Sequence, residues 1–301
     1  MDQEDYGRFL SAQGLRTVKA AGELWVEKRK LFLENIPPHR RIRLDRWNAM
    51  KLFLRGYAVL RYSCEEAEGR PSFEYICDDR NYDLHSLGHK ARNQTRQGLK
   101  NCVVRPINFD LLSDQGVPIN RSVFARQGRP GPPFLAEERL WKQYMRACRS
   151  MQDVEAWGAH VDEQLCAFVI VVFVDDYAYL FHPHALSESL KHRPMNALVF
   201  SVVQALLLRP MVKRVSYGLE PFLSLPALED FKISMGFRRS SIGRRIVVNL
   251  LARPFLTRPV ERVARGLVAS GRFKGVLGDF LTFTQSFREQ SLSGKHTEAR
   301  L

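Results

Sequence analysis

Three residues whose side chains can exchange protons stand at the ends of expected strands. His182 ends one apolar run, and Tyr217 and Glu220 end a run that begins at Arg214. A carboxylate or an imidazole can accept a proton from a reacting amine, and a tyrosine can donate one to a departing group. We therefore interpret the three as candidate catalytic residues. The alternatives are a core tyrosine and an ordinary turn at Glu220.

A basic turn before an expected helix is the second chemical signature. Lys191, His192 and Arg193 precede Pro194, and proline is favoured in the first turn of a helix. The free N–H groups of a helix start and the positive end of its dipole attract anions. We expect Lys191, Arg193 and Asn196 to bind the phosphates of a co-substrate. The alternative is a solvated basic loop.

Residues 82–100 have the spacing of an amphipathic helix. Its polar side carries charges of one sign: His85, His89, Arg92, Arg96 and Lys100. A face of one sign is costly unless an anion compensates it, so we predict that Arg92 and Arg96 help to hold an acidic ligand. A merely solvated face is the alternative.

The elements that must position these residues are clearest in the second half. Strand-like runs at residues 157–161, 165–174 and 177–181 are separated by short acidic turns, as in an antiparallel meander. There follow a helix from Pro194 to Pro210, a strand over 214–219, a helix over 225–235 ended by Gly236, and a strand over 242–251. The order is βββαβαβ.

The first half is less regular. An amphipathic helix is expected over residues 23–35, strands over 57–62 and 73–77 that form a hairpin, and a helix over 137–151. We divide the chain into a divergent N-terminal half (1–150), a C-terminal domain (151–251) and a basic amphipathic tail (252–301). Such a tail could dock on an anionic membrane.

Composition bounds the class of protein. The chain has 301 residues, a net charge of +14 and five scattered cysteines, which favour a reducing compartment and anionic partners. The N-terminus lacks the basic-then-apolar order of a signal peptide, and no apolar run reaches the ~20 residues of a membrane span. We therefore expect a cytoplasmic protein. Peripheral contact with the inner face of the membrane is an alternative. His182-Pro-His184 has no third ligand at a convincing spacing, so no metal is expected.

Several segments together resemble one superfamily. They are residues 90–96 (KARNQTR), 157–161 (WGAHV), 215–219 (VSYGL) and 231–237 (FKISMGF). The first resembles the Arg/Asn-rich helix of FemAB-like proteins, and the last is similar to their F/Y-K-x-x-x-G-F segment. With the element order, they identify residues 82–251 as similar to the GNAT acyltransferases.

The resemblance implies an α+β fold with a mixed sheet flanked by helices and a second, divergent GNAT-like half. It implies direct transfer of an acyl group, from acetyl-CoA or another acyl-CoA, to a small-molecule or peptide amine. The loop that binds pyrophosphate in GNAT enzymes is Q/R-x-x-G-x-G/A, whereas residues 191–196 read KHRPMN. FemAB-like relatives tolerate this loss, and some use aminoacyl-tRNA as the donor. Two alternatives therefore stay open: a tRNA-dependent aminoacyltransferase, and a non-catalytic module that binds anionic membrane or nucleic acid.

Overall fold

The computed structural model describes residues 1–220 and 226–249, which form two compact units. Unit 1 comprises residues 1–17, 74–219 and 226–240; the described part of unit 2 comprises residues 18–73, 220 and 241–249. Each unit thus mixes segments from both sides of residue 150. The division into halves at that residue stays a prediction, and the expected tail lies outside the described residues.

The sheet of unit 1 contains strands in the order β5-β10-β9-β8-β7-β6. Their bounds are β5 Arg70–Cys77, β6 Val103–Ile107, β7 Val154–Val161, β8 Gln164–Val174, β9 Tyr177–Ala185 and β10 Arg214–Leu219. Strands β7, β8 and β9 form the predicted antiparallel meander. Strand β10 pairs parallel with β9 and antiparallel with β5. The apolar run of β8 is almost fully buried because it lies in the middle of the sheet.

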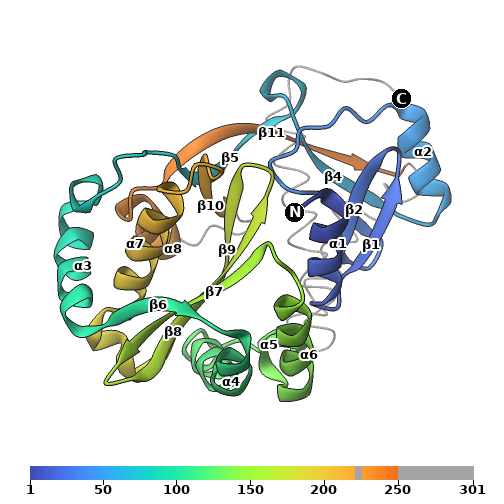
Figure 1. Cartoon of the computed structure of the whole chain (residues 1–301). Coiled ribbons are helices and arrows are strands. Elements are labelled where there is room, and N and C mark those ends of the chain that lie inside the picture. Colours follow the sequence, from blue (N-terminus) through green and yellow to red (C-terminus); the bar gives the residue numbers. More distant parts are fainter. Residues whose placement is uncertain (221–225, 250–301) are drawn as a thin grey trace. The chain divides into compact units, whose positions relative to one another are not determined.

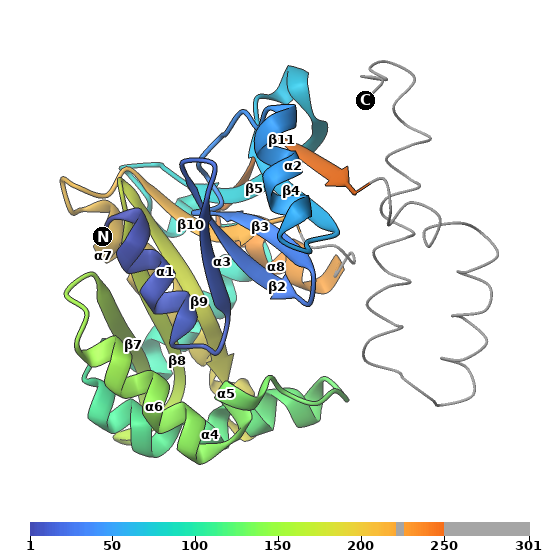
Figure 2. The same ribbon diagram turned by 90° about the vertical axis from the view of Figure 1, so that its right-hand side faces the viewer.

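Helices pack on this sheet from both sides (Figures 1 and 2). They are α1 Gln3–Ser11, α3 His89–Asn101, α4 Phe109–Arg126, α5 Pro133–Ala136, α6 Glu138–Arg149, α7 Pro194–Leu207 and α8 Pro226–Ser234. Helix α7 contacts β7, β8, β9 and β10, whereas α4 contacts β8 and β9. The predicted order βββαβαβ is confirmed, and Gly236 has the positive φ of 85° that ends a helix.

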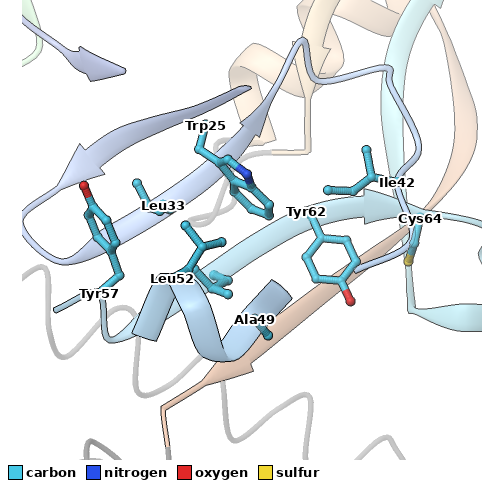
Figure 3. Packing of buried hydrophobic residues seen from close by; sticks show 9 residues of the cluster. Trp25, Leu33, Ile42, Ala49, Leu52, Tyr57, Tyr62 and Cys64 are labelled. Carbon is cyan, nitrogen blue, oxygen red and sulfur yellow. The ribbon is translucent and has the colours of Figure 1, made fainter. Parts of the chain in front are cut away.

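Unit 2 contains strands in the order β1-β2-β3-β4-β11 and helix α2 Arg46–Leu54. The strands span β1 Arg16–Ala20, β2 Glu23–Arg29, β3 Phe32–Ile36, β4 Val59–Cys64 and β11 Arg238–Val248. Ala49 and Leu52 of α2 pack on Trp25, Leu33 and Tyr62 of the sheet, all nearly inaccessible to solvent (Figure 3). This cluster fixes the rotation of α2 about its axis.

Two predictions for this region are wrong. Residues 23–35 form the β2–β3 hairpin rather than a helix, with Leu24 opposite Ile36 and Leu31 in the left-handed turn at φ 67°. Strand β4 does not form a hairpin with β5, because β11 pairs with β4 instead. A Cβ at Gly69 would lie 2.9 Å from the backbone nitrogen of Arg244, so this glycine permits the close approach of β11.

Three short 3₁₀ segments complete the described chain: η1 Glu66–Glu68, η2 Leu84–Ser86 and η3 Glu188–His192. In the described residues, no helix has both the length and the apolar character needed to cross a membrane.

Candidate active site

Strands β9 and β10 pair over only three residues. The parallel register joins Arg214 to Tyr177 and ends where Ser216 meets Tyr179, although β9 continues to Ala185. A Cβ built at Gly218 would meet no atom within 4 Å among the residues that the structure describes, its chain neighbours aside. The carboxyl ends of the two strands therefore part beside open space, which is where parallel α/β units bind ligands.

Helix α7 connects these two strands, so its N-terminus belongs to the same edge of the sheet as their carboxyl ends. Arg193 is its N-cap, in the left-handed conformation at φ 58°, and Pro194 is its first residue, as predicted. The Nε atom of Arg193 is buried and has no hydrogen-bond partner in the described part of the chain. A buried guanidinium nitrogen without a partner is costly unless an anion satisfies it.

The basic turn uses most of its own N–H groups internally. The backbone nitrogens of Ser189, Leu190 and Arg193 donate to carbonyls three residues earlier, at 3.1–3.3 Å. Met195 and Asn196 retain helix-start N–H groups without a backbone partner among the described residues. This turn suits one anionic group rather than the extended pyrophosphate cradle of a glycine-rich loop.

The side chains of the other residues predicted in this turn differ in exposure. Lys191 is exposed, and its carbonyl accepts a hydrogen bond from Gln97 of α3 at 3.5 Å. Asn196 is 8% exposed, and its amide nitrogen lies 3.5 Å from the sulfur of Met235. Both are therefore near the helix start, but only Lys191 extends into solvent.

Helix α3 packs closely against this turn through Gly98. A Cβ at Gly98 would lie 2.6 Å from the Arg193 carbonyl oxygen. On the same helix, Arg92 donates to the carbonyls of His85 and Leu87, both at 3.2 Å, and Arg96 is exposed. The guanidinium of Arg92 thus orders the segment before α3, while Arg96 lies on its predicted basic face.

Lys232 of α8 is buried between two tyrosine rings. Its Nζ atom lies 4.3 Å from the ring centroid of Tyr75 on β5 and 5.0 Å from that of Tyr217 on β10. Its side chain makes no ion pair within 4.0 Å among the described residues, and Glu229 acts on it only at longer range. Burial lowers the pKa of Lys232 to about 8, and Glu229 partly opposes this shift.

The surroundings of Lys232 are themselves held in place. The hydroxyl of Tyr75 donates to Glu229 at 2.9 Å, and the ring of Tyr217 packs edge-on against Phe237 at 5.3 Å. Burial raises the pKa of Tyr217 well above its ordinary value, so its phenol stays protonated at neutral pH. We call Lys232, Tyr75, Tyr217 and Glu229 the lysine cage.

Strands β5 and β10, which carry Tyr75 and Tyr217, also hold a buried hydrogen-bonded pair. Ser216 on β10 donates to Glu74 on β5 at 2.5 Å and accepts from the backbone nitrogen of Gly218 at 3.1 Å. Glu74 and Ser216 are 3% and 0% exposed. This pair fixes the backbone of β10 at the residue where it leaves β9.

The candidate catalytic residues do not share one environment. Tyr217 belongs to the lysine cage. His182 lies at a β-bulge of β9, with φ 53°, among the rings of Phe134, Tyr144 and His184. Glu220 belongs to unit 2, where it accepts a hydrogen bond from Ser72 at 2.7 Å. Of the three, Tyr217 has Lys232 against its ring, whereas the charge of Glu220 acts on the buried Arg61.

Unit 2 has its own buried ionic cluster. Glu34 on β3 pairs with Arg244 on β11 and, at 3.7 Å, with Arg61 on β4, while Arg244 also donates to Ser63 at 2.7 Å. Burial alone would raise the pKa of Glu34, but the charges of Arg244 and Arg61 hold it below its usual value. Burial and the charge of Arg244 lower the pKa of Arg61 to about 10, so Arg61 stays charged at neutral pH.

Sequence reasoning missed the lysine cage as a unit. Lys232 lies in the FemAB-like segment, but its burial and its aromatic neighbours depend on the pairing of β5 with β10. The sequence feature that could have drawn attention to this region is Glu74, next to Tyr75, because a carboxylate inside an apolar strand indicates a buried polar contact. In the described chain, no three His, Cys, Asp or Glu side chains are placed to hold a metal ion.

Comparisons with known proteins identify the fold. No family model matches the sequence, and no curated protein matches it. A solved structure of FemX matches with a TM-score of 0.58 at 10% identity, over 83% of this chain and 92% of FemX.

Two further solved structures match at similar length. The C-terminal domain (DUF2156) of a putative lysylphosphatidylglycerol synthetase from Agrobacterium fabrum has a TM-score of 0.55 at 11% identity, over 85% of this chain and 91% of that domain. L-PGS from Bacillus licheniformis has a TM-score of 0.53 at 11% identity, over 84% and 91%. With the βββαβαβ order and the parting of β9 from β10, these likenesses show that the chain shares the α+β fold of these three structures, as the resemblance to GNAT proteins predicted.

Proposed function

We propose that this protein is an N-acyltransferase that moves an acyl or aminoacyl group to an amine. The observation that carries the proposal is a buried cation, Lys232 of α8, which lies against Tyr217 on the strand β10 that parts from β9. When an amine attacks a carbonyl carbon, negative charge develops on the carbonyl oxygen. A desolvated ammonium stabilises such an oxyanion far more than a solvated one does.

The roles of the residues follow from their protonation. With a pKa of about 8, Lys232 is mainly an ammonium at neutral pH and can stabilise the oxyanion. Tyr217, protonated and beside Lys232, can donate a proton to the leaving group as it departs. The amine nitrogen forms the new bond directly to the acyl carbon, and no covalent intermediate with the protein is required. His182, in unit 1, remains a candidate for the base that receives the proton of the amine, and the role of Glu220 stays a prediction from the sequence.

The acyl donor is either an acyl-CoA or an aminoacyl-tRNA. An acyl-CoA would place its phosphates at the start of α7, near Arg193. In the turn before α7, the N–H groups of Ser189, Leu190 and Arg193 are already used within the turn, which favours instead a donor with a single phosphate at this position, such as the terminal nucleotide of an aminoacyl-tRNA. The exposed basic face of α3 could neutralise further phosphates of a tRNA.

The choice of donor can be tested by the stability of the folded protein. Acetyl-CoA, a long-chain acyl-CoA and bulk tRNA are each added at two salt concentrations, and the midpoint of thermal unfolding is measured. Stabilisation by a CoA thioester supports the acyl-CoA donor, and stabilisation by tRNA that weakens steeply with salt supports the aminoacyl donor.

Variants at the start of α7 make this test specific. Arg193→Glu should abolish the stabilisation, whereas the distant exposed Arg149→Glu should not. Unchanged stabilisation of the Arg193 variant would remove that residue from the site. No response to any donor would favour a non-catalytic module.

A further inference from the structure

Helix α2 of unit 2 presents a stripe of large apolar residues to solvent. Trp47 is 78% exposed, Leu54 80% and Met50 49%. Their spacing of i, i+3 and i+7 places them on one side of the helix. The opposite side is anchored by Ala49 and Leu52 in the core of unit 2 (Figure 3), so the stripe cannot turn inward without unpacking that core.

Single exposed apolar residues are normal on a protein surface, but an aligned stripe that includes a tryptophan marks a contact site. The other three tryptophans show the contrast, because Trp25, Trp141 and Trp157 are each less than 9% exposed. Trp47 is thus the one tryptophan of the chain that lies open to solvent.

The sequence around the stripe is rich in basic residues, of which Arg40, Arg41 and Arg43 pair with glutamates. Between Lys28 and Arg55 the sequence has nine Lys or Arg residues and two acidic ones, Glu34 and Asp45. Glu34 is paired with buried arginines, and Asp45 caps α2 by accepting from the Asn48 nitrogen at 2.8 Å. Helical geometry places Arg46 and Lys51 on either flank of the stripe, and Arg55 follows the last turn.

We propose that α2 is a docking site for a bilayer surface that contains anionic lipids. Trp47, Met50 and Leu54 would enter the boundary between headgroups and acyl chains, while Lys51 and Arg55 would contact lipid phosphates. An apolar stripe bordered by cations has the design of an interfacial helix, and each nearby cation adds to the attraction of an anionic leaflet. This inference does not depend on the proposed acyl transfer.

The charge of this surface favours an anionic bilayer over a second copy of the chain or an RNA. A second copy would bring two surfaces of the same strong positive charge together, which opposes association. An RNA would satisfy the cations, and an unstacked base could stack on Trp47, but Met50 and Leu54 would gain little from it. A bilayer with anionic headgroups satisfies both the stripe and its border.

Trp47 supplies a direct reporter, because the other tryptophans are already buried. The full chain is mixed with vesicles of phosphatidylglycerol and phosphatidylcholine, or of phosphatidylcholine alone, and both sedimentation and tryptophan emission are measured. We expect binding to the anionic vesicles, a shift of the emission to shorter wavelength, and weaker binding at high salt. Replacement of Trp47 by Phe should remove the shift and leave the sedimentation nearly unchanged.

Matched surface variants then test the stripe. The double variant Trp47→Ser, Leu54→Ser should bind the anionic vesicles at least about tenfold more weakly. The control is Leu208→Ser, Met211→Ser, since these residues of unit 1 are 73% and 74% exposed and should have no effect. Circular dichroism checks that all variants keep their fold.

Four outcomes would overturn the proposal. The first is no binding to anionic vesicles, and the second is an equal loss of binding in the control variant. The third is sedimentation with vesicles while the emission of Trp47 is unchanged, which would assign docking to another segment such as residues 250–301. The fourth is an emission that shifts with protein concentration alone, which would assign the stripe to a second copy.

Discussion

The two units bury their cations in opposite ways. In unit 2, Arg244 and Arg61 gather around the carboxylate of Glu34 and are satisfied by it and by Ser63. In unit 1, Lys232 has the faces of two tyrosines and no ion pair within 4.0 Å among the described residues. A compensated cluster suits a structural role, whereas an under-compensated cation suits interaction with charge that appears during a reaction.

The largest effect should come from removing the carboxylate of unit 2. Glu34→Gln leaves two buried arginines facing each other, and we expect the free energy of unfolding to fall by about 3–5 kcal/mol in urea denaturation. The wild-type protein should lose the same stabilisation as pH falls through the lowered pKa of Glu34, because the folded state must then take up a proton. Glu163→Gln, which removes an exposed pair with Arg105, should cost less than about 1 kcal/mol. Equal costs would show that the Glu34 cluster is not buried in solution.

The lysine cage should show its largest effect in catalysis instead. Lys232→Met should lower the rate of acyl transfer about 100-fold, or about 2.7 kcal/mol, because the oxyanion loses its cation. The same variant should be more stable than the wild type at pH 7, since a buried charge has been removed. Lys213→Met, at an exposed lysine before β10, is the control for both measurements. A rate that falls together with stability would assign Lys232 a structural role.

The titration of Lys232 should also make the stability of unit 1 depend on pH in a way that the Glu34 cluster of unit 2 does not. Its pKa is about 8 in the folded state against 10.5 when unperturbed, so the folded state releases this proton first as pH rises. Stability should therefore increase between about pH 8 and pH 10.5, by up to about 3 kcal/mol, while turnover falls above pH 8. In Lys232→Met this part of the stability profile should be flat. A turnover that rises through pH 8 would instead make the neutral amine the active form.

The smallest effect is expected at Arg61. In Arg61→Met, Glu34 keeps its pair with Arg244, and the free energy of unfolding should change by less than about 1 kcal/mol. The measurement is the same urea denaturation as for Glu34→Gln. A loss as large as that of the Glu34 variant would mean that both arginines are needed to hold the carboxylate.

Much of unit 1 could be predicted because local signals agree there. Strands β7, β8 and β9 are apolar runs divided by tight turns with Asp162 and Asp175 at positive φ, and Pro194 begins α7 where proline is favoured. The β2–β3 hairpin was missed because Leu24, Leu31 and Leu33 mimic helical spacing, and its turn uses Leu31 in a left-handed conformation that no glycine or asparagine announces.

The candidate site could be predicted only in part, because it depends on strand pairing and burial. Tyr217 could be singled out at a strand end, but its neighbour Tyr75 is reached through the register that pairs Ser216 with Ile76. Lys232 has no local sign of burial, since a lysine in a helix is usually solvated. Exposure is likewise a tertiary property, so Trp47 could not be recognised as a surface residue before α2 was placed on its core.

The pairing of β4 with β11 also bears on how the protein is synthesised. Arg244, which donates to Ser63, follows it by 181 residues, and at about 5–20 residues per second the ribosome needs roughly 10–40 s to make that stretch. During this interval β4 has emerged without the strand that covers its edge, and Glu34 awaits an arginine not yet translated. Completion of unit 2 thus waits for the translation of β11, which makes the nascent chain a natural client for chaperones that shield strand edges.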